Sequence, residues 1–276
     1  MSEIKIAAPL YIVRKECETD LFAVLERISQ LGFEGVEFLG FFGKAPAEIK
    51  DKMKELNLVP VGNHVDYYEF LQDSASVIKL HKEIGCKYIT IGGLPEDMIK
   101  DREELSVYLD NVIRIGRECR EQGITLLYHN HDKELKYNLD GISLLQYMMD
   151  RLPMESISLE PDLGWIMIGG GEPKLFLERY MNRCPIVHLK DFYAEDITKI
   201  GNVSELNSQK GDEAHSYFEF RPVGYGIGNL PALMKRILNC NPEWIVADHD
   251  LAYERDSFFD LKVSFDYIKN MLAIVS

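Results

Sequence analysis

Short apolar runs alternate along the whole chain with longer segments whose apolar residues recur at intervals of three and four. The short runs are rich in Ile, Val, Leu and Tyr, as buried strands are, and the longer segments have the periodicity of helices. Strands that alternate with helices form parallel sheets. The pattern therefore predicts eight strands, at residues 4–12, 35–39, 59–64, 88–91, 124–129, 157–162, 186–190 and 244–248.

Eight helices are predicted between and after these strands. Glycines follow several helical segments, as C-terminal caps do, and prolines stand in several first turns, where a missing N–H is tolerated. This alternation indicates the α/β class and, within it, a single (β/α)8 TIM barrel. No Pro/Gly/Ser-rich linker divides the chain, so we expect one domain over residues 1–276. The predicted helices span residues 20–31, 46–56, 70–84, 103–122, 143–151, 173–180, 230–238 and 257–271.

One tract does not follow the alternation. Residues 193–229 end in RPVGYGIGN and are too many for a simple strand-to-helix turn. Loops of this length are often functional, so we expect the tract to contribute to a site. Two histidines outside the polar strand ends, His81 and His215, are expected at the surface.

Polar residues stand where four of the predicted strands end. The segment ITLLYHNHDKEL, at residues 124–135, is the clearest case, because an apolar run leads directly into two histidines. An isolated pair of histidines can simply cap a strand, but here three other apolar runs also end in residue types that bind metals. In a barrel, the carboxyl ends of the strands converge on one mouth. We therefore expect a common site there, formed by His64, His129, Asp162, His188 and Asp248.

Composition and charge narrow the classes of function. The chain has 276 residues, of which 46% are hydrophobic and 28% charged, and its net charge of −14 opposes binding to a phosphate backbone. We therefore expect no nucleic-acid partner. The five cysteines are scattered without CxxC spacing, which argues against a disulfide framework and a cysteine-based zinc site. The sequence shows neither a membrane span nor a signal cleavage site, so we expect a cytoplasmic protein with no membrane partner; the oligomeric state, a homo-oligomer included, is left open.

Several short motifs occur in a fixed order along the chain. They are YHNH in GITLLYHNHDKEL, DLGW in LEPDLGW, HLKD in IVHLKDF, and the flanking segments IGCKYITIGGL and VGYGIGNL. Each motif alone is weak, but the combination is specific and extends over nearly the whole chain. It resembles the xylose isomerase-like TIM barrel superfamily, and within it the sugar phosphate isomerase/epimerase branch. The resemblance implies a small-molecule substrate, a sugar or keto-sugar.

The resemblance also implies a metal site, because in this superfamily four strand ends hold one divalent ion, commonly through Glu, Asp, His and Glu. Carried over to this sequence, the ligands are His129, Asp162, His188 and Asp248. His129 departs from the common glutamate, although YHNH is usual in this branch, and Asp248 is one methylene shorter than the usual glutamate. Two imidazoles with two carboxylates suit a divalent transition metal. We expect one Mn ion, with Zn, Co, Fe or Mg as alternatives.

The activity implied is that of a metal-dependent sugar or keto-sugar isomerase/epimerase of carbohydrate metabolism. A metal of this kind polarises a carbonyl and its neighbouring hydroxyl and stabilises the enediolate formed on deprotonation. The same enolate can expel a β-leaving group, so a lyase or dehydratase acting on a keto-sugar, an inosol or a keto-glycoside is the first alternative. A non-catalytic sugar-binding protein with a decayed metal site is an alternative of another class. Endonuclease IV shares the barrel, but the acidic charge argues against a DNA substrate.

Proton transfer requires further groups, and the candidates include two carboxylates ranked ahead of two histidines. Glu160 lies two residues before Asp162 on the same strand face, so it can act as a base, although an inward carboxylate can also be a structural ion pair. His131 can instead orient a metal ligand. The four catalytic candidates are Glu160, Asp248, His64 and His131.

Four residues are expected to bind the substrate. Glu37 and His64 can contact hydroxyls, and Lys190 can neutralise an oxyanion. Trp165 offers an apolar face on which a sugar can stack. Structural alternatives are an ion pair for Glu37, a strand cap for His64 and a core position for Trp165. For Lys190 the alternative is a pair with Asp191.

Overall fold

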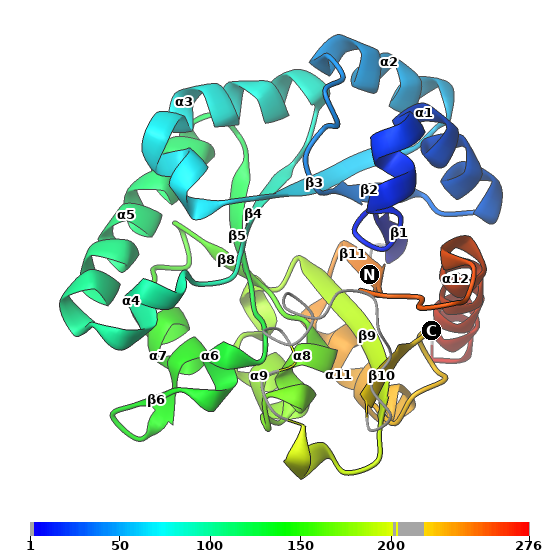
Figure 1. Ribbon diagram of the computed structural model, residues 1–276. Coiled ribbons are helices and arrows are strands. Elements are labelled where there is room, and N and C mark those ends of the chain that lie inside the picture. Colours follow the sequence, from blue (N-terminus) through cyan, green and yellow to red (C-terminus); the bar gives the residue numbers. More distant parts are fainter. Residues whose placement is uncertain (1–2, 201–202, 204–217, 276) are drawn as a thin grey trace.

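Eight parallel strands form a curled sheet at the centre of the computed structural model, which describes residues 3–200, 203 and 218–275. Figure 1 shows the strands around a common centre with the helices outside them. The α/β prediction is confirmed, and each predicted strand is present with its ends moved by a few residues. The strands are β1 (Lys5–Pro9), β2 (Gly35–Phe38), β3 (Val59–Val65), β4 (Tyr88–Gly92), β5 (Thr125–His129), β8 (Ser158–Glu160), β9 (Ile186–Ala194) and β11 (Trp244–Asp248).

The strand order brings the two ends of the sheet together. The neighbours run β9, β11, β1, β2, β3, β4, β5 and β8, all paired in parallel. The edge strands β8 and β9 are linked, in the described part of the chain, by a single bridge between Asp162 and His188. There the backbone N–H of His188 donates to the carbonyl of Pro161 at 3.0 Å. The bridge therefore joins two residues that were expected to share a site.

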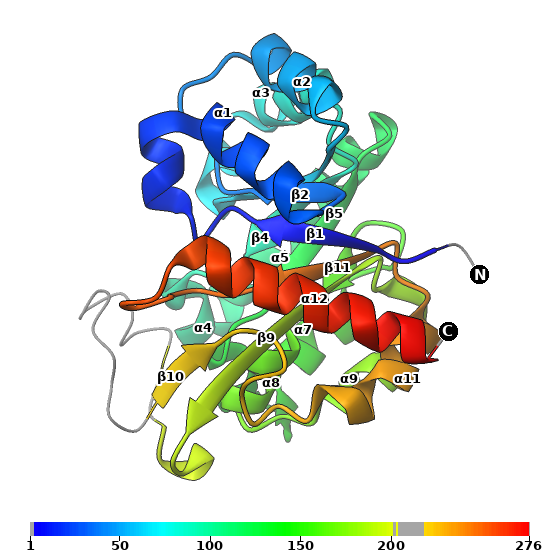
Figure 2. The same cartoon turned by 90° about the vertical axis from the view of Figure 1, so that its right-hand side faces the viewer.

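All eight predicted helices are present, and they cover the outside of the sheet. They are α1 (Arg14–Leu31), α2 (Pro46–Glu55), α3 (Tyr67–Ile84), α5 (Arg102–Glu121), α7 (Leu144–Arg151), α9 (Pro173–Arg179), α11 (Leu230–Cys240) and α12 (Ser257–Val275). Helix α12 packs against α1 and α11 and over β1 and β11, so the last unit contacts the first (Figure 2). Among the described residues, no helix has the length and apolar content to cross a membrane.

Several short elements were not predicted. With two to six residues each they are too short to give a periodic signal, and all of them follow the carboxyl ends of strands β4, β5 and β8 or precede α7. They are the helices α4 (Glu96–Lys100), α6 (Lys133–Lys136) and α8 (Leu163–Ile168), and the hairpin of β6 (Asn138–Leu139) with β7 (Ile142–Ser143). The helix ends themselves follow the sequence signals: Gly32 and Gly85 cap α1 and α3 with positive φ of 101° and 100°.

Side-chain alternation along the strands changes the inside of the sheet from apolar to polar. Because side chains alternate between the two faces, residues two apart share a face. On β5 the inward positions run from Leu127 to His129, and on β11 from Val246 to Asp248. The polar site therefore lies directly above an apolar floor, which buries Ala7, Val61, Tyr88, Leu127, Ile186, Trp244 and Val246.

The irregular tract contains a strand that the sequence pattern did not predict. Strand β9 continues to Ala194, beyond the predicted end at residue 190, because β10 (Phe218–Arg221) pairs with it antiparallel. The next segment wraps around the carboxylate of Asp191, which accepts the N–H groups of Gly224, Gly226 and Gly228 at 3.0, 2.9 and 3.0 Å. A Cβ on Gly226 would lie 2.1 Å from that carboxylate, so the close approach requires glycine.

The surface position expected for His81 is wrong. Its side chain is 2% exposed, because Ile78, His81 and Ile84 recur every three residues on the buried face of α3. Its Nδ1 lies 2.7 Å from the carbonyl of Val77, and its Nε2 lies 2.9 Å from the amide nitrogen of Asn63. The neutral ring therefore satisfies one donor and one acceptor. His215 lies outside the described residues.

Acid should weaken this buried contact. Burial lowers the pKa of His81 from its usual 6.5, so the unfolded chain takes up the proton first. The stability that the neutral ring provides is complete above pH 6.5 and is lost as the pH falls toward the lowered pKa. Between pH 7 and pH 5 the wild type should lose up to about 2 kcal/mol more unfolding free energy than His81→Gln. Urea unfolding at both pH values measures this, and parallel losses in the two proteins would contradict it.

Candidate metal centre and substrate cavity

A cavity of about 470 Å³ opens at the carboxyl ends of the strands. Its volume lies within the range of small-molecule sites. The four residues expected to bind a substrate come from β2, β3, β9 and α8, and all of them line the cavity: Glu37, His64, Lys190 and Trp165. Their role in substrate binding stays a prediction, and Trp165 is also part of a core cluster and only 2% exposed.

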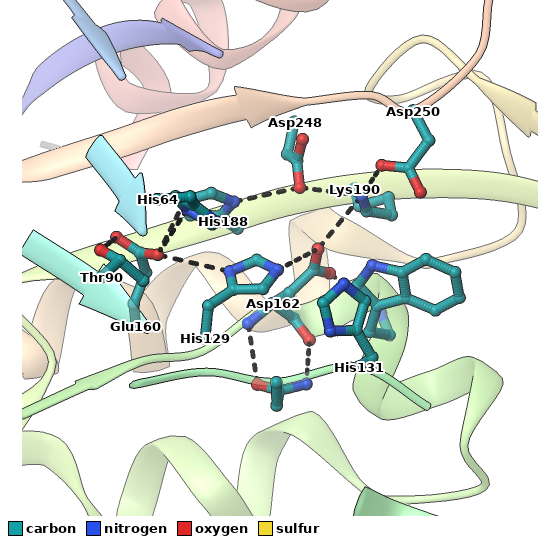
Figure 3. A network of polar contacts seen from close by, with 12 residues as sticks. His64, Thr90, His129, His131, Glu160, Asp162, His188, Lys190, Asp248 and Asp250 are labelled. Carbon is teal, nitrogen blue, oxygen red and sulfur yellow. Dashed lines mark hydrogen bonds and ion pairs between the residues drawn. The ribbon is translucent and has the colours of Figure 1, made fainter. Parts of the chain in front are cut away.

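The four predicted metal ligands lie together, and three of them, His129, His188 and Asp248, line this cavity. One ligand atom from each lies within 4.8 Å of the others, and all four side chains are buried. The Nδ1 of His188 is 3.0 Å from Oδ2 of Asp248, and the Nε2 of His129 is 3.9 Å from Oδ2 of Asp162 (Figure 3). We call His129, Asp162, His188 and Asp248 the outer set.

A second group of ligand atoms shares two histidines with the first. We call His64, His129, Glu160 and His188 the inner set, and its ligand atoms also lie within 4.8 Å of one another. The Oε2 of Glu160 is 3.2 Å from Nε2 of His64, 3.3 Å from Nδ1 of His129 and 3.6 Å from Nε2 of His188. Glu37 stands beside this set, with Oε2 3.2 Å from His64 and 3.1 Å from His188.

The chemistry of these atoms fits a bound cation. Buried polar atoms normally have a hydrogen-bond partner. Here six of them at one place form no hydrogen bond of acceptable geometry, in spite of their short separations. Imidazole nitrogens and carboxylate oxygens are the usual ligands of divalent transition metals. The six atoms are Glu37 Oε1, His64 Nε2, His129 Nδ1, Glu160 Oε2, Asp162 Oδ2 and His188 Nε2.

Lys190 places a protein cation next to the outer set. Its side chain is 1% exposed, and its Nζ lies 3.3 Å from Oδ2 of Asp162 and 2.8 Å from Oδ2 of Asp248. It also contacts Asp250, two residues after Asp248 on the same strand end, a residue that alternation could have assigned to the site. The alternative pairing of Lys190 with Asp191 is therefore wrong, because Asp191 is taken by backbone N–H groups.

The charges of the outer set follow from this contact. Burial opposes the charge of Lys190, but the three carboxylates outweigh it and raise the pKa of its ammonium. Burial also opposes ionisation of Asp248, yet Lys190 and His188 hold the pKa of that carboxyl well below its usual range. Burial dominates at Asp162 and raises the pKa of its carboxyl, with the charge of Asp248 acting in the same direction. Asp248 is thus the ionised member of the pair.

The site histidines divide into two classes. Burial alone would lower the pKa of His64, but the carboxylates of Glu37 and Glu160 outweigh it and raise that pKa to about 10. The same two carboxylates, with Asp248, raise the pKa of His188 against the effect of burial. Burial lowers the pKa of His129 and of His131 to about 3, helped by neighbouring positive groups. The inner set and the adjoining Glu37 therefore bring two carboxylates together, whose charge either protons or a cation must balance.

Residues in and next to the YHNH segment hold the site residues in place through hydrogen bonds. The side-chain amide of Asn130 accepts the N–H of Asp162 at 3.1 Å and lies 3.4 Å from the carbonyl of the same residue. Glu134 accepts the N–H of His131 at 3.0 Å and the hydroxyl of Tyr128 at 2.6 Å. Neither Asn130 nor Glu134 was predicted to have a role, because a buried amide and a buried carboxylate carry no spacing signal of their own.

The four candidates for proton transfer differ in access to the cavity. His64, His131 and Asp248 line it. Glu160 is fully buried, lies behind the cavity wall and has Oε1 3.3 Å from the hydroxyl of Thr90. A group that moves a substrate proton must come within hydrogen-bond reach of it. The position of Glu160 therefore suits a ligand better than a base.

The model of one protein family matches residues 25–252, described as xylose isomerase-like TIM barrel. The chain belongs to this family. The superfamily resemblance drawn from YHNH, DLGW and HLKD is thereby confirmed.

Curated relatives in this family include an inosose dehydratase of Bacillus cereus, 26% identical over 155 residues, which are 54% of this chain and 51% of the relative. Another, from Geobacillus kaustophilus, is 25% identical over 190 residues, with 61% of each protein covered. The chain thus spans about half to three fifths of the length of these relatives.

Solved structures of similar fold carry names of two enzyme classes. A sugar phosphate isomerase/epimerase from Parabacteroides distasonis has a TM-score of 0.77 and 19% identity, with 98% of this chain and 94% of that chain covered. The probable 3-DHS dehydratase of petrobactin synthesis from Bacillus anthracis has a TM-score of 0.74 and 12% identity, with 97% and 99% covered. At these identities the likeness concerns the fold.

Proposed function

We propose that this protein is a divalent-metal-dependent enzyme that deprotonates the carbon next to the ketone of a polyhydroxylated small molecule and then releases a β-leaving group, as a dehydratase does. One observation carries the proposal. Buried ring nitrogens and carboxylate oxygens without hydrogen-bond partners gather at and directly behind the wall of a cavity of about 470 Å³. We place this site in a single domain of residues 1–276, on a closed (β/α)8 barrel.

Both ligand sets can hold one divalent ion, and His129 and His188 belong to each of them. The predicted outer set and the preference for Mn stay proposals. When bound, the ion would act as a Lewis acid toward a substrate carbonyl and its neighbouring hydroxyl. The protein would bind the rest of the substrate through the four cavity residues Glu37, His64, Trp165 and Lys190.

We assign proton removal to Asp248, which is ionised and lines the cavity. The ammonium of Lys190, 2.8 Å from Asp248, would stabilise the negative charge that develops on the substrate oxygen. The proton that Asp248 removes would then return to the leaving hydroxyl, so that water departs, while His131, which lines the same cavity as a neutral ring, would orient that hydroxyl. Glu160 has no such access, and we assign it to the metal centre rather than to the substrate.

The curated relatives support elimination over isomerisation, because several of them are named inosose dehydratases. The sequence analysis ranked isomerisation first and elimination second. Isomerase/epimerase activity stays the second candidate, since similar solved structures carry that name. Both outcomes begin with the same proton removal and differ in whether the carbanion expels a group or is reprotonated.

Product mass separates these outcomes. The metal-loaded protein is incubated in D2O with a panel of ketoses, keto-inositols and 3-keto-glycosides, followed by mass spectrometry. We expect loss of water or of an aglycone from at least one compound. Deuterium uptake without loss of a fragment would instead establish the isomerase/epimerase. Neither change with any compound that binds would contradict the enzyme proposal and favour a sugar-binding protein.

A further inference from the structure

The inner and outer sets would bind an ion through different ring nitrogens of His129 and His188. His129 turns Nδ1 toward Glu160 and Nε2 toward Asp162. His188 turns Nε2 toward the inner set and Nδ1 toward Asp248. Each ring nitrogen that is not a ligand must find another partner, so the contacts of the nitrogens indicate which set holds the ion.

Three spacings within the inner set match four-coordinate binding. Metal–nitrogen and metal–oxygen bonds of about 2.1 Å place tetrahedral ligand atoms about 3.4 Å apart. The distances from Oε2 of Glu160 to the three histidine nitrogens are 3.2, 3.3 and 3.6 Å. All four of these atoms are buried and lack a hydrogen-bond partner. These four atoms thus face one another, and either shared protons or a cation can satisfy them.

The outer set differs, because both oxygens of Asp248 already have hydrogen-bond partners and, of the four carboxylate oxygens, only Oδ2 of Asp162 lacks one. Asp248 accepts the N–H of His249 at 2.7 Å through Oδ1, and its Oδ2 contacts His188 and Lys190 at 3.0 and 2.8 Å. Asp162 accepts the N–H of Trp165 at 2.9 Å through Oδ1, and its Oδ2 lies 3.3 Å from the ammonium of Lys190. An ion between these oxygens would lie beside a buried like charge, which is costly in a medium of low dielectric constant.

We infer that the divalent ion binds in the inner set, through His64, His129, Glu160 and His188, and that Lys190 is the permanent cation of the outer set. This inference rests on the proposed function only in requiring that a metal is bound. Asp248 then acts as the partner that orients His188 through its other ring nitrogen, an arrangement common around metal-bound histidines. Three imidazoles and one carboxylate favour Zn²⁺, Co²⁺ or Fe²⁺ over Mg²⁺.

A matched pair of substitutions tests the assignment. Glu160 and Asp162 are two residues apart at one strand end, and both are fully buried, so Glu160→Gln and Asp162→Asn make the same chemical change. Metal-free proteins are titrated with Co²⁺, whose visible absorption is strong when the ion is four-coordinate. Glu160→Gln should weaken binding about 100-fold or more and abolish the strong band, whereas Asp162→Asn should change affinity less than about tenfold and keep the band.

His64 provides a second variant, since it belongs to the inner set alone. His64→Asn should weaken Co²⁺ binding as Glu160→Gln does, and thermal unfolding in the presence of a chelator checks that each variant is folded. Loss of binding in Asp162→Asn, or unchanged binding in both inner-set variants, would overturn the inference and leave the proposed function standing. A wild type that binds no Co²⁺, Zn²⁺ or Mn²⁺ would overturn the proposed function itself.

Discussion

His188→Ala should purify with almost no divalent metal and should have no measurable activity. His188 contributes Nε2 to the inner set and Nδ1 to the outer set, so its removal deletes a ligand in either arrangement. Mutating a residue that hydrogen-bonds to a metal ligand typically lowers metal affinity about 10–100-fold. Removing the ligand itself should therefore lower metal affinity at least about 100-fold. Metal content of the dialysed protein, by elemental mass spectrometry, measures the effect.

His81→Gln is the matched control for this loss. His81 is as buried as His188, but it lies in α3 and bonds to Val77 and Asn63. The control should keep the metal content of the wild type. Equal metal content in His188→Ala and the wild type would show that the ion, if any, binds elsewhere.

Lys190→Met should be the most destabilising of the substitutions considered. It removes the ammonium that three carboxylates share and leaves Asp248 as a buried negative charge. Removing one partner of a buried ion pair typically costs about 3–5 kcal/mol, because the remaining charge has lost its solvent without compensation. Urea unfolding at pH 7 with a chelator present, so that metal binding does not contribute, should show a loss of this size.

Lys262→Met is the control for a lysine in an ion pair at the surface. Lys262 pairs with Asp266 four residues later on α12, and the two side chains are 42% and 50% exposed. Such pairs contribute about 0–1 kcal/mol, so this variant should be close to the wild type. The loss in Lys190→Met should also shrink at low pH, since the unpaired carboxylates can then be protonated. A loss in Lys190→Met no larger than in the control would contradict the role assigned to Lys190.

The local sequence pattern was sufficient to predict the strands of the sheet and the inward position of several site residues. The runs ending at His129, His188 and Asp248 are strands, and their period of two assigns these side chains to the inside. The strand order then brings them together, as a parallel barrel requires. The same reasoning places Glu160 inward, but it does not separate a ligand from a base, because that depends on which residues face the cavity.

What the sequence did not predict depends on contacts between distant segments. That Lys190 contacts Asp162, Asp248 and Asp250 rather than Asp191 follows from β9 lying beside β11, and from the glycine loop that occupies Asp191. The inner set joins His64 from β3 to Glu160 from β8, and no short-range spacing links those two strands. The burial of His81 is different, because the spacing of Ile78, His81 and Ile84 along α3 was readable from the sequence.

Solvent exchange at the substrate carbon tests the central claim most directly. A keto-inositol or other keto-polyol is followed in D2O with the wild-type protein, once after chelation and dialysis and once after addition of one divalent ion per chain. The account predicts deuterium exchange or elimination with the reconstituted protein, and at least about a 100-fold slower reaction with the metal-free protein. Equal rates with and without the ion, for a compound that does react, would contradict it.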